Sequence, residues 1–259
     1  MAGMELTISD RGSRSDTGMS RAMNEDAVFE GQCLFVVADG IGGHRAGEVA
    51  SSIACDAIRS SATRIPGDPA ASLRAWLEEA NVAVYDAANA DPELSGMGTT
   101  AVAAFVGDGV VVIGHVGDSR AYRVRDGSLE RLTKDHTFVG ELVDGGVLTP
   151  EEAAKHPARG QLLRALGRGR DVSPAIAVHD AADGDLFMLC SDGLTGMVGE
   201  AEVAAFLQLP VPLHDIADRL IEAANAGGGK DNITVALFRL AVDDDQRAQT
   251  TVTNRIIRS

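Results

Sequence analysis

The chain has 259 residues, of which 45% are hydrophobic, so one large domain with an extended core is feasible. Its formal net charge of −15 at pH 7 argues against nucleic acid and anionic membranes as main partners. The same charge repels phosphorylated ligands unless bound cations reverse the field locally. No apolar run is long enough to cross a membrane, and residues 1–14 lack a signal-peptide core, so we expect a cytoplasmic protein.

The spacing of the cysteines bears on redox state and metal chemistry. Cys33, Cys55 and Cys190 are far apart and form no Cys-x-x-Cys pair. An odd, scattered set of this kind favours buried reduced thiols over disulfide bonds or a zinc site. We therefore expect the cysteines to act as small hydrophobic core residues.

The first third of the chain is predicted to pass from strand to helix. Residues 9–26 are rich in Arg, Asp, Gly and Ser, and they predict a loop that leads into a short strand at 27–29. Residues 34–38 are a short apolar run typical of a buried strand, which ends at Asp39 and a series of glycines. Apolar residues at helical spacing then predict two amphipathic helices, over 46–58 and 73–88.

The middle of the chain is predicted to form an antiparallel sheet. Four strands are expected, over 99–106, 110–116, 121–125 and 128–132. The first two are joined by three residues and the last two by Asp126-Gly127, which is the strongest short hairpin signal. We assign Asp126 to a turn for this reason.

Residues 133–170 differ from their surroundings because they are polar and contain many glycines. Short helical pieces are predicted within them, over 139–144, 150–155 and 161–166. Long irregular insertions often serve as functional lids, so we expect this segment to be a flap inserted over the domain.

The last part of the chain returns to strands and helices. Strands are predicted over 176–179, 185–190 and 233–240, and helices over 200–207 and 211–226. Two sets of strands with helices around them imply two packed sheets, each with one face on the other sheet and one on helices. The polar tail, residues 243–259, is expected to be loose.

Four carboxylates share one kind of local context. Asp39, Asp118, Asp192 and Asp231 each lie beside or near a glycine at the margin of an apolar strand. If the strand ends meet at one edge, these carboxylates converge, and two of them about 4 Å apart repel by about 4 kcal/mol at an effective dielectric constant of 20. Divalent cations would remove that penalty, and donors that are all oxygen favour Mg²⁺ or Mn²⁺ over zinc. A single Asp-Gly pair is also common in turns, so the ordered set carries more weight than its members.

Two metal ions bridged by one carboxylate are suited to hydrolysing phosphate esters. A guanidinium group would complete such a site by holding the phosphate. The candidates for that role are Arg14 and Arg21, which both precede Asp39.

The ordered motifs resemble the bacterial metal-dependent Ser/Thr protein phosphatases of type 2C. The resemblance covers about residues 9–240. It rests on Arg21-x-x-Asn24-Glu25-Asp26, Ala38-Asp39-Gly40-Ile41-Gly42-Gly43-His44, Gly98-Thr99-Thr100, Gly117-Asp118-Ser119-Arg120, Ser191-Asp192-Gly193-Leu194 and Lys230-Asp231-Asn232-Ile233-Thr234.

The resemblance implies an α+β fold, a four-layer α-β-β-α sandwich of two mostly antiparallel sheets flanked by helices. It implies one phosphatase domain over residues 1–242, with the flap at about 133–170. The site would lie at one edge of the sandwich.

The resemblance also implies roles for individual residues. Asp39 would bridge two Mn²⁺ or Mg²⁺ ions, with the Gly40 carbonyl, Asp192 and Asp231 as further ligands. Asp118, together with Asp192, would hold a third, weaker ion. Arg21 would bind the phosphate, and Glu25 and Asp26 would orient metal-bound waters.

The general acid for the leaving group stays open. Some relatives carry a histidine directly after the Asp-Gly pair, where this chain has Ile41, and its histidine comes later, at His44. His44 is the candidate acid, with a role at the start of the helix as the alternative. A metal-bound water is a second source of the proton.

The function implied by the resemblance is hydrolysis of phospho-Ser and phospho-Thr in proteins by a metal-activated water. Its expected partners are phosphorylated proteins and a cognate Ser/Thr kinase, with neither nucleic acid nor membrane among them. Two alternatives remain: a non-catalytic phosphoprotein-binding module of the same fold, and a phosphatase dedicated to one regulatory protein. The presence of Asp39, Asp192 and Asp231 speaks against the non-catalytic alternative.

Overall fold

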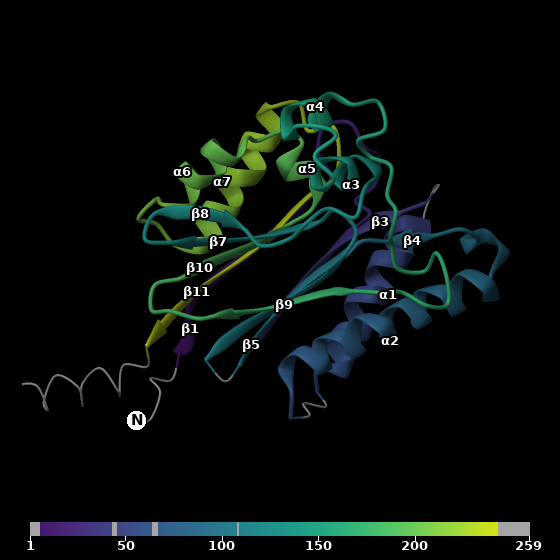
Figure 1. Ribbon diagram of the computed structural model, residues 1–259, viewed down its shortest axis with the longest axis horizontal. Helices are drawn as coiled ribbons and strands as arrows, with labels where there is room; N and C mark the ends of the chain where they lie inside the picture. The colour runs from purple at the N-terminus through teal and green to yellow at the C-terminus, as the bar shows by residue number, and fades with distance from the viewer. Residues whose placement is uncertain (1–5, 43–45, 64–66, 108, 243–259) are drawn as a thin grey trace, which may run out of the picture.

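The computed structural model describes residues 6–42, 46–63, 67–107 and 109–242. Two antiparallel sheets pack face to face, and helices cover the outer face of each, as Figure 1 shows. The predicted four-layer α-β-β-α architecture and α+β class are therefore confirmed. No helix within these ranges is both long and apolar enough to span a bilayer.

The first sheet carries the last strand of the described chain near its centre. Its order is β1 (Leu6–Asp16), β11 (Ile233–Val242), β10 (Leu186–Cys190), β7 (Arg120–Arg125) and β8 (Ser128–Arg131). Its outer face is covered by α5 (Asp192–Thr195), α6 (Glu200–Leu207) and α7 (Leu213–Ala226).

The second sheet is built mainly from the first half of the chain. Its order is β2 (Asp26–Glu30), β3 (Leu34–Ile41), β5 (Ala101–Gly107), β6 (Val110–Val116) and β9 (Ala175–Asp180), and the short β4 (Gly98–Thr99) pairs with the end of β3. Its outer face is covered by α1 (Ala46–Ser61) and α2 (Pro69–Ala90), after which comes a 3-10 turn, Pro92–Leu94.

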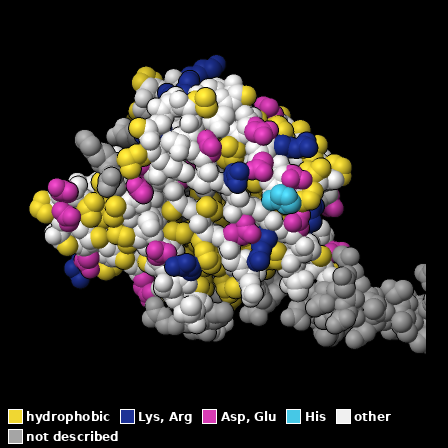
Figure 2. Space-filling model, turned by 180° about the vertical axis from the view of Figure 1, so that it is seen from behind, with side chains coloured by type: hydrophobic (Ala, Val, Ile, Leu, Met, Phe, Trp, Pro, Cys, Tyr) yellow, Lys and Arg dark blue, Asp and Glu magenta, His cyan; other side chains and the backbone are white. Residues whose placement is uncertain are grey.

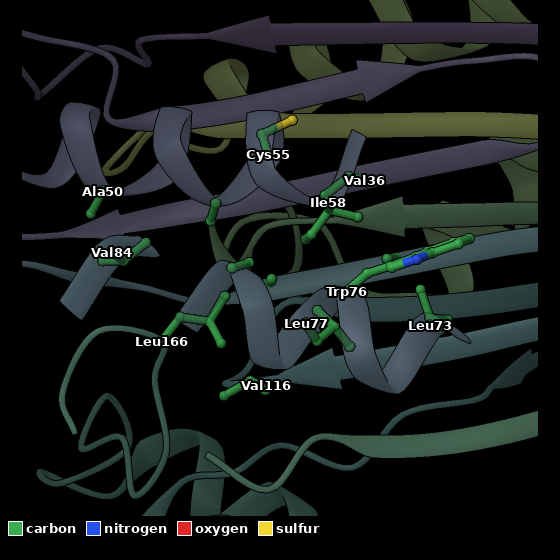
Figure 3. Close-up of a cluster of buried hydrophobic side chains, with 14 of the residues drawn as sticks. Val36, Ala50, Cys55, Ile58, Leu73, Trp76, Leu77, Val84, Val116 and Leu166 are labelled. Atoms are coloured by element: carbon green, nitrogen blue, oxygen red, sulfur yellow. The ribbon is translucent and has the colours of Figure 1, made fainter. Parts of the chain in front are cut away.

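Three apolar cores hold the four layers together. Between the sheets, the ring of Phe238 stacks on Phe35 and on Phe187, with centroid distances of 4.4 and 5.0 Å. On the outer side of the second sheet, Trp76 and Leu77 of α2 pack with Ile58 of α1, as Figure 3 shows. Each sheet thus buries one face on the other sheet and one on helices, and burial on both sides stabilises the fold because both faces are largely apolar.

The start of the chain was predicted wrongly. Residues 9–26 were expected to be a loop, but 6–16 form the eleven-residue strand β1, which pairs with β11 along nearly its whole length. The strand lies at the edge of its sheet, where one side of the backbone is open to solvent and polar side chains are tolerated. Its stability comes from β11, more than 200 positions away, and not from any apolar pattern of its own.

The segment between β8 and β9 contains two short helices, α3 (Phe138–Asp144) and α4 (Pro150–Lys155), close to the predicted positions. The third predicted helix, over 161–166, is wrong. Those residues are not helical, and Leu162 and Leu166 form isolated bridges with Thr137 and Thr99. The first bridge lies within the segment, and the second fastens it to the end of the second sheet that carries Asp39.

Smaller predictions agree with the structure. The Asp126-Gly127 turn connects β7 and β8 with positive φ at both residues, 51° and 76°, as a two-residue hairpin requires. The three cysteines are free thiols; Cys55 and Cys190 are buried, whereas Cys33 is half-buried. Burial raises the pKa of the Cys55 and Cys190 thiols to about 12, which keeps them protonated and unreactive.

Candidate metal centre

The site begins where β2 and β3 lie side by side. Asp39 on β3 is directly opposite Asp26 on β2, so the antiparallel register places two carboxylates next to each other. The backbone around Asp39 is fixed by Thr100, whose amide donates to the Asp39 carbonyl at 2.9 Å and whose Oγ1 accepts from the Asp39 amide at 3.1 Å. Thr99 Oγ1 also donates to the Asp39 carbonyl, at 2.8 Å.

Close backbone approach explains why a glycine follows Asp39. The Gly40 amide donates to the Glu25 carbonyl at 3.1 Å, and a Cβ at position 40 would lie 2.1 Å from the Gly47 carbonyl oxygen of α1. A side chain there would push α1 away from the strand. Gly40 thus lets α1, β2 and β3 meet beside the Asp39 carboxylate.

Asp192 and Asp231 come to the same place from the other sheet. Asp192 is the first residue of α5, directly after β10, and Asp231 precedes β11. A Cβ at Gly193 would lie 1.9 Å from the Asn232 carbonyl oxygen, so the two loops touch through their backbones. The Asn232 side chain accepts from the Glu25 amide at 2.8 Å, which ties these loops to the start of β2.

The carboxylates repel one another strongly enough to change their proton affinities. Burial raises the pKa of Asp39 well above its usual value, and the charges of four other carboxylates add to the rise: Asp26, Asp192, Asp118 and Asp231. Burial likewise raises the pKa of Asp26 to about 7, against hydrogen bonds from Thr234 and Ser191 that lower it. Burial and then Asp231 raise the pKa of Asp192, and the Asp39 side chain partly offsets this by a hydrogen bond.

Asp118 joins the group from the turn between β6 and β7. Burial and then the charge of Asp192 raise the pKa of Asp118 to about 7. The turn is held by Gly117, whose amide donates to His136 Nδ1 at 3.2 Å and whose φ of +103° favours glycine. His136 in turn stacks on His115 with the ring centroids 4.5 Å apart.

The two candidate arginines lie in different surroundings. Arg21 donates to Asp231 Oδ2 at 2.8 Å and lies 3.9 Å from Glu25 Oε2, so its guanidinium is at the rim of the acidic group. Arg14, on β1, pairs with Asp218 of α7 at 2.9 Å. Only Arg21 is therefore placed next to the carboxylates.

The donors are all oxygen atoms, which suits a hard divalent cation. Asp26 Oδ1 is buried and has no hydrogen-bond partner among the described residues, which marks a carboxylate in need of a positive neighbour. Within the described part of the chain, no three His, Cys, Asp or Glu side chains are arranged to hold one ion between them. An ion here would take much of its shell from water and backbone carbonyls, as Mg²⁺ commonly does.

Comparison with known proteins agrees with this geometry. Residues 19–230 match the sequence profile described as "Protein phosphatase 2C". The serine/threonine phosphatase stp of Listeria monocytogenes is 42% identical over 234 residues, which cover 86% of this chain and 93% of that protein. The chain belongs to the protein phosphatase 2C family.

Solved structures and further relatives give the same family. The crystal structure of the Mycobacterium tuberculosis serine/threonine phosphatase PstP/Ppp is similar with a TM-score of 0.85 and 43% identity, covering 91% of this chain and 99% of that one. The catalytic domain of PstP in complex with two manganese ions is similar with a TM-score of 0.84 and 41% identity, covering 92% of this chain. The PstP sequence itself is 45% identical over 225 residues, and the match spans 43% of its length, so this chain corresponds to less than half of that protein.

In this phosphatase 2C chain, the sequence motifs did not reveal the residues that hold the carboxylates in place. Ser191 Oγ donates to Asp26 Oδ2 at 2.8 Å and accepts from the Thr234 amide at 3.0 Å. Ser191 precedes Asp192 and Thr234 follows Asp231 by three residues, so motif proximity was the available signal. Their partners on β2 are too distant in sequence to be deduced from it.

A second charged group adjoins the first and was not predicted. Arg120 forms a two-pronged contact with Asp135, Nε to Oδ1 at 3.1 Å and Nη2 to Oδ2 at 2.7 Å, and Arg131 also pairs with Asp135. Arg120 further donates to the Tyr122 hydroxyl, which donates to Glu200 at 3.1 Å. This network links β7, the segment after β8 and α6 behind the Asp118 turn.

The candidate acid His44 lies outside the described residues. The sequence assigns it the position just before α1, whose described start is Ala46.

On the face shown in Figure 2, acidic side chains are spread among hydrophobic and basic ones and do not form one continuous patch. The acidic side chains on this face are thus distributed widely.

Proposed function

We propose that this chain is a metal-dependent phosphatase that removes phosphate from phospho-Ser and phospho-Thr in proteins. The observation that carries the proposal is the group of five aspartates around Asp39. Burial and mutual repulsion raise the pKa values of Asp39, Asp26 and Asp118, and this uncompensated charge calls for bound cations. The relatives named above, which are called serine/threonine phosphatases, support the choice of substrate.

The carboxylates would hold Mn²⁺ or Mg²⁺. Asp39 would bridge two ions, with the Gly40 carbonyl, Asp192 and Asp231 as further ligands, and Asp118 with Asp192 would hold a third. Bound in this way, two divalent ions supply an activated water and positive charge for the phosphate oxygens. A PstP structure that contains two manganese ions supports the first two positions, and the third rests on the location of Asp118.

Residues around these ligands would orient the substrate. Arg21 would exchange its contact with Asp231 for a contact with the incoming phosphate, because its side chain is 47% exposed and its guanidinium lies at the rim of the carboxylates. Glu25 and Asp26 would accept hydrogen bonds from ordered waters, and burial raises the pKa of both carboxyls. His44 is kept as the candidate that protonates the leaving oxygen.

The domain would extend over residues 1–242, with the segment at about 133–170 acting as the flap that meets the substrate protein. We place the protein in the cytoplasm, opposing a Ser/Thr kinase, with no role for nucleic acid or membrane. The net charge of −15 supports the last point, because it disfavours polyanionic partners.

The test is hydrolysis of an aryl phosphate and of a phosphothreonine peptide with Mn²⁺, with and without chelator. We expect turnover only with the metal, and loss of turnover in Asp192→Ala. Turnover that survives both chelator and the substitution would refute the metal mechanism. Calorimetric titration separates the non-catalytic alternative, which predicts phosphopeptide binding without Mn²⁺ or Mg²⁺ uptake.

A further inference from the structure

Positive charge gathers in one short part of an otherwise acidic chain. From Ala153 to Arg170 the sequence contains no Asp or Glu but has five Lys and Arg residues, in a chain whose net charge is −15. The basic residues are Lys155, Arg159, Arg164, Arg168 and Arg170. All five are exposed. We call residues 155–170 the basic arm.

The basic arm is anchored in the core. Leu166 is fully buried and lies in the cluster between α1, α2 and the second sheet, near Val84 and Val116, as Figure 3 shows. Its amide donates to the Thr99 carbonyl at 2.8 Å and its carbonyl accepts from the Thr99 amide at 3.1 Å. Gly167 has a φ of +83°, and a Cβ there would lie 2.4 Å from the Val84 side chain. The backbone on either side of Leu166 therefore has a fixed position.

Arg164 and Arg168, on either side of this anchor, have no counterion among the residues that the structure describes. Within the described residues neither forms an ion pair, whereas Arg120, Arg125 and Arg131 of the first sheet are each paired with an aspartate. Two exposed guanidinium groups held two residues on each side of a buried leucine repel each other and attract anions. Because both groups are exposed, they are accessible to an anionic ligand.

The anchor lies beside the carboxylates. Thr99, which pairs with Leu166, also donates from its Oγ1 to the Asp39 carbonyl at 2.8 Å. Arg164 Nη1 is 3.5 Å from His136 Nε2, and His136 accepts from the amide of Gly117, next to Asp118. His136 thus links Arg164 to the turn that carries Asp118, and Thr99 links Leu166 of the arm to Asp39.

An exposed apolar group accompanies the charges. Leu163 of the arm is 49% exposed and Phe138 of α3 is 39% exposed, and the two neighbourhoods are joined by a hydrogen bond from the Phe138 amide to the Gln161 carbonyl. Apolar side chains rimmed by unpaired cations are typical of surfaces that bind a peptide, since the apolar contact adds area and the cations add specificity.

We propose that Arg164 and Arg168 bind a second phosphate on the substrate segment, so that multiply phosphorylated segments are the preferred substrate class. The proposal rests on the proposed function and adds which phosphoproteins it favours. A phosphate matches two guanidinium groups better than a single carboxylate does, because it carries more charge and more acceptor oxygens. The positive charge of Arg164 and Arg168 favours such a segment over neutral or basic ones, although the net charge of the protein is negative.

The experiment compares two peptides that share one phosphothreonine. One peptide also carries a non-hydrolysable phosphonate about two to five residues away, a range that spans roughly 7–18 Å in extended chain. With Mn²⁺ at low salt, we expect the phosphonate to raise kcat/KM about tenfold, mainly through KM, and this preference to shrink as salt is added. In Arg164→Gln/Arg168→Gln the preference should fall to about onefold to twofold.

Two matched variants separate binding from structure. Arg164→Lys/Arg168→Lys keeps the charge and should retain part of the preference. Arg59→Gln/Arg219→Gln removes the same charge from exposed positions on α1 and α7 and should retain all of it. Equal kcat/KM for the two peptides in the unaltered protein, or an unchanged preference in the double glutamine variant, would overturn the proposal.

Failure of the proposed function would look different. If the unaltered protein with Mn²⁺ turns over neither aryl phosphate nor either peptide, the phosphatase proposal is wrong. Fluorescence anisotropy of the labelled phosphonate peptide, with the protein in chelator, then still tests whether the basic arm binds an anion. We expect tighter binding of the phosphonate peptide that depends on Arg164 and Arg168, and equal binding of both peptides would refute the arm as an anion site.

Discussion

Two neighbouring groups of charged side chains in this molecule differ in how their charges are balanced. Around Asp39, five aspartates meet with Arg21 at the rim, and burial together with mutual repulsion raises the pKa values of Asp39, Asp26 and Asp118. Around Asp135, two arginines surround one aspartate, and its hydrogen bonds and charge help to raise the pKa of Arg120 against burial. Both groups are partly buried, so desolvation acts on both, but only the second is balanced by its own side chains.

The difference indicates which group is a site and which is a support. Removing charges from water costs several kcal/mol per ion, and well-placed partners must offset that cost for the fold to be stable. The Asp135 network offsets it within the protein and links three elements. The Asp39 group leaves it unbalanced, so its stability is expected to depend on added cations.

The largest effect should come from neutralising the centre of the acidic group. Asp39→Asn removes the carboxylate that would bridge two ions, and we expect kcat for aryl phosphate to fall by about a thousandfold or more. The metal-free variant should melt at a higher temperature than the unaltered protein because one repelling charge is gone. Steady-state kinetics with Mn²⁺ measures the first effect and thermal unfolding with chelator measures the second. A lower melting temperature of the variant in chelator would contradict the comparison.

In the balanced network around Asp135, removing the acidic charge should lower stability. Asp135→Asn leaves Arg120 and Arg131 partly buried without a counterion, and the free energy of unfolding should fall by about 3 kcal/mol. Urea unfolding measures it. Asp56→Asn is the control, because it breaks the exposed Arg59–Asp56 pair on α1 and should cost less than about 0.5 kcal/mol. Equal losses in the two variants would show that burial of the Asp135 network does not matter.

The comparison also predicts how pH changes stability. Folding raises the pKa of Asp26 from 3.8 to about 7, so the folded state binds a proton more tightly than the unfolded state does. The stability of the metal-free protein should therefore fall as pH rises from about 4 to about 7, and the melting temperature should drop by a few degrees.

Saturating Mn²⁺ should remove or reverse this trend, because the metal binds deprotonated carboxylates. Asp26→Asn should flatten the dependence in chelator. Melting temperatures at several pH values, with chelator and with Mn²⁺, measure it. Stability that rises with pH in chelator, and does so equally in Asp26→Asn, would count against repulsion among these carboxylates.

The sequence could predict the architecture because both faces of most strands are apolar and turns separate them clearly. It failed where local pattern and tertiary contact disagree. Leu162 and Leu166 are spaced like residues on one face of a helix, yet they form isolated bridges with Thr137 and Thr99, and the residues between them are not helical. β1 has too few apolar residues to be recognised, because its partner β11 supplies the order.

The same distinction between local pattern and tertiary contact applies to the residues of the candidate site. Asp39, Asp118, Asp192 and Asp231 could be found because each carries a local signal, an aspartate beside glycine at a strand end. Asp135 and Ser191 could not be assigned roles, because what they do depends on contacts with Arg120 and Asp26 from other layers. The candidate ligands could thus be predicted from local sequence, whereas the residues that hold them in place could not.

The smallest effect separates the two arginines that the sequence offered for phosphate binding. Arg14 is 61% exposed and contacts Asp218, so Arg14→Gln should cost at most about 1 kcal/mol of stability and leave KM for a phosphopeptide unchanged. Arg21→Gln should raise that KM about tenfold or more, because a charge-assisted contact with phosphate is lost beside the carboxylates. Steady-state kinetics on both variants decides between them. A matching rise in KM for Arg14→Gln would mean that phosphate is attracted by the long-range positive charge of both arginines and not by a direct contact with Arg21, since Arg14 reaches α7 and not Asp231.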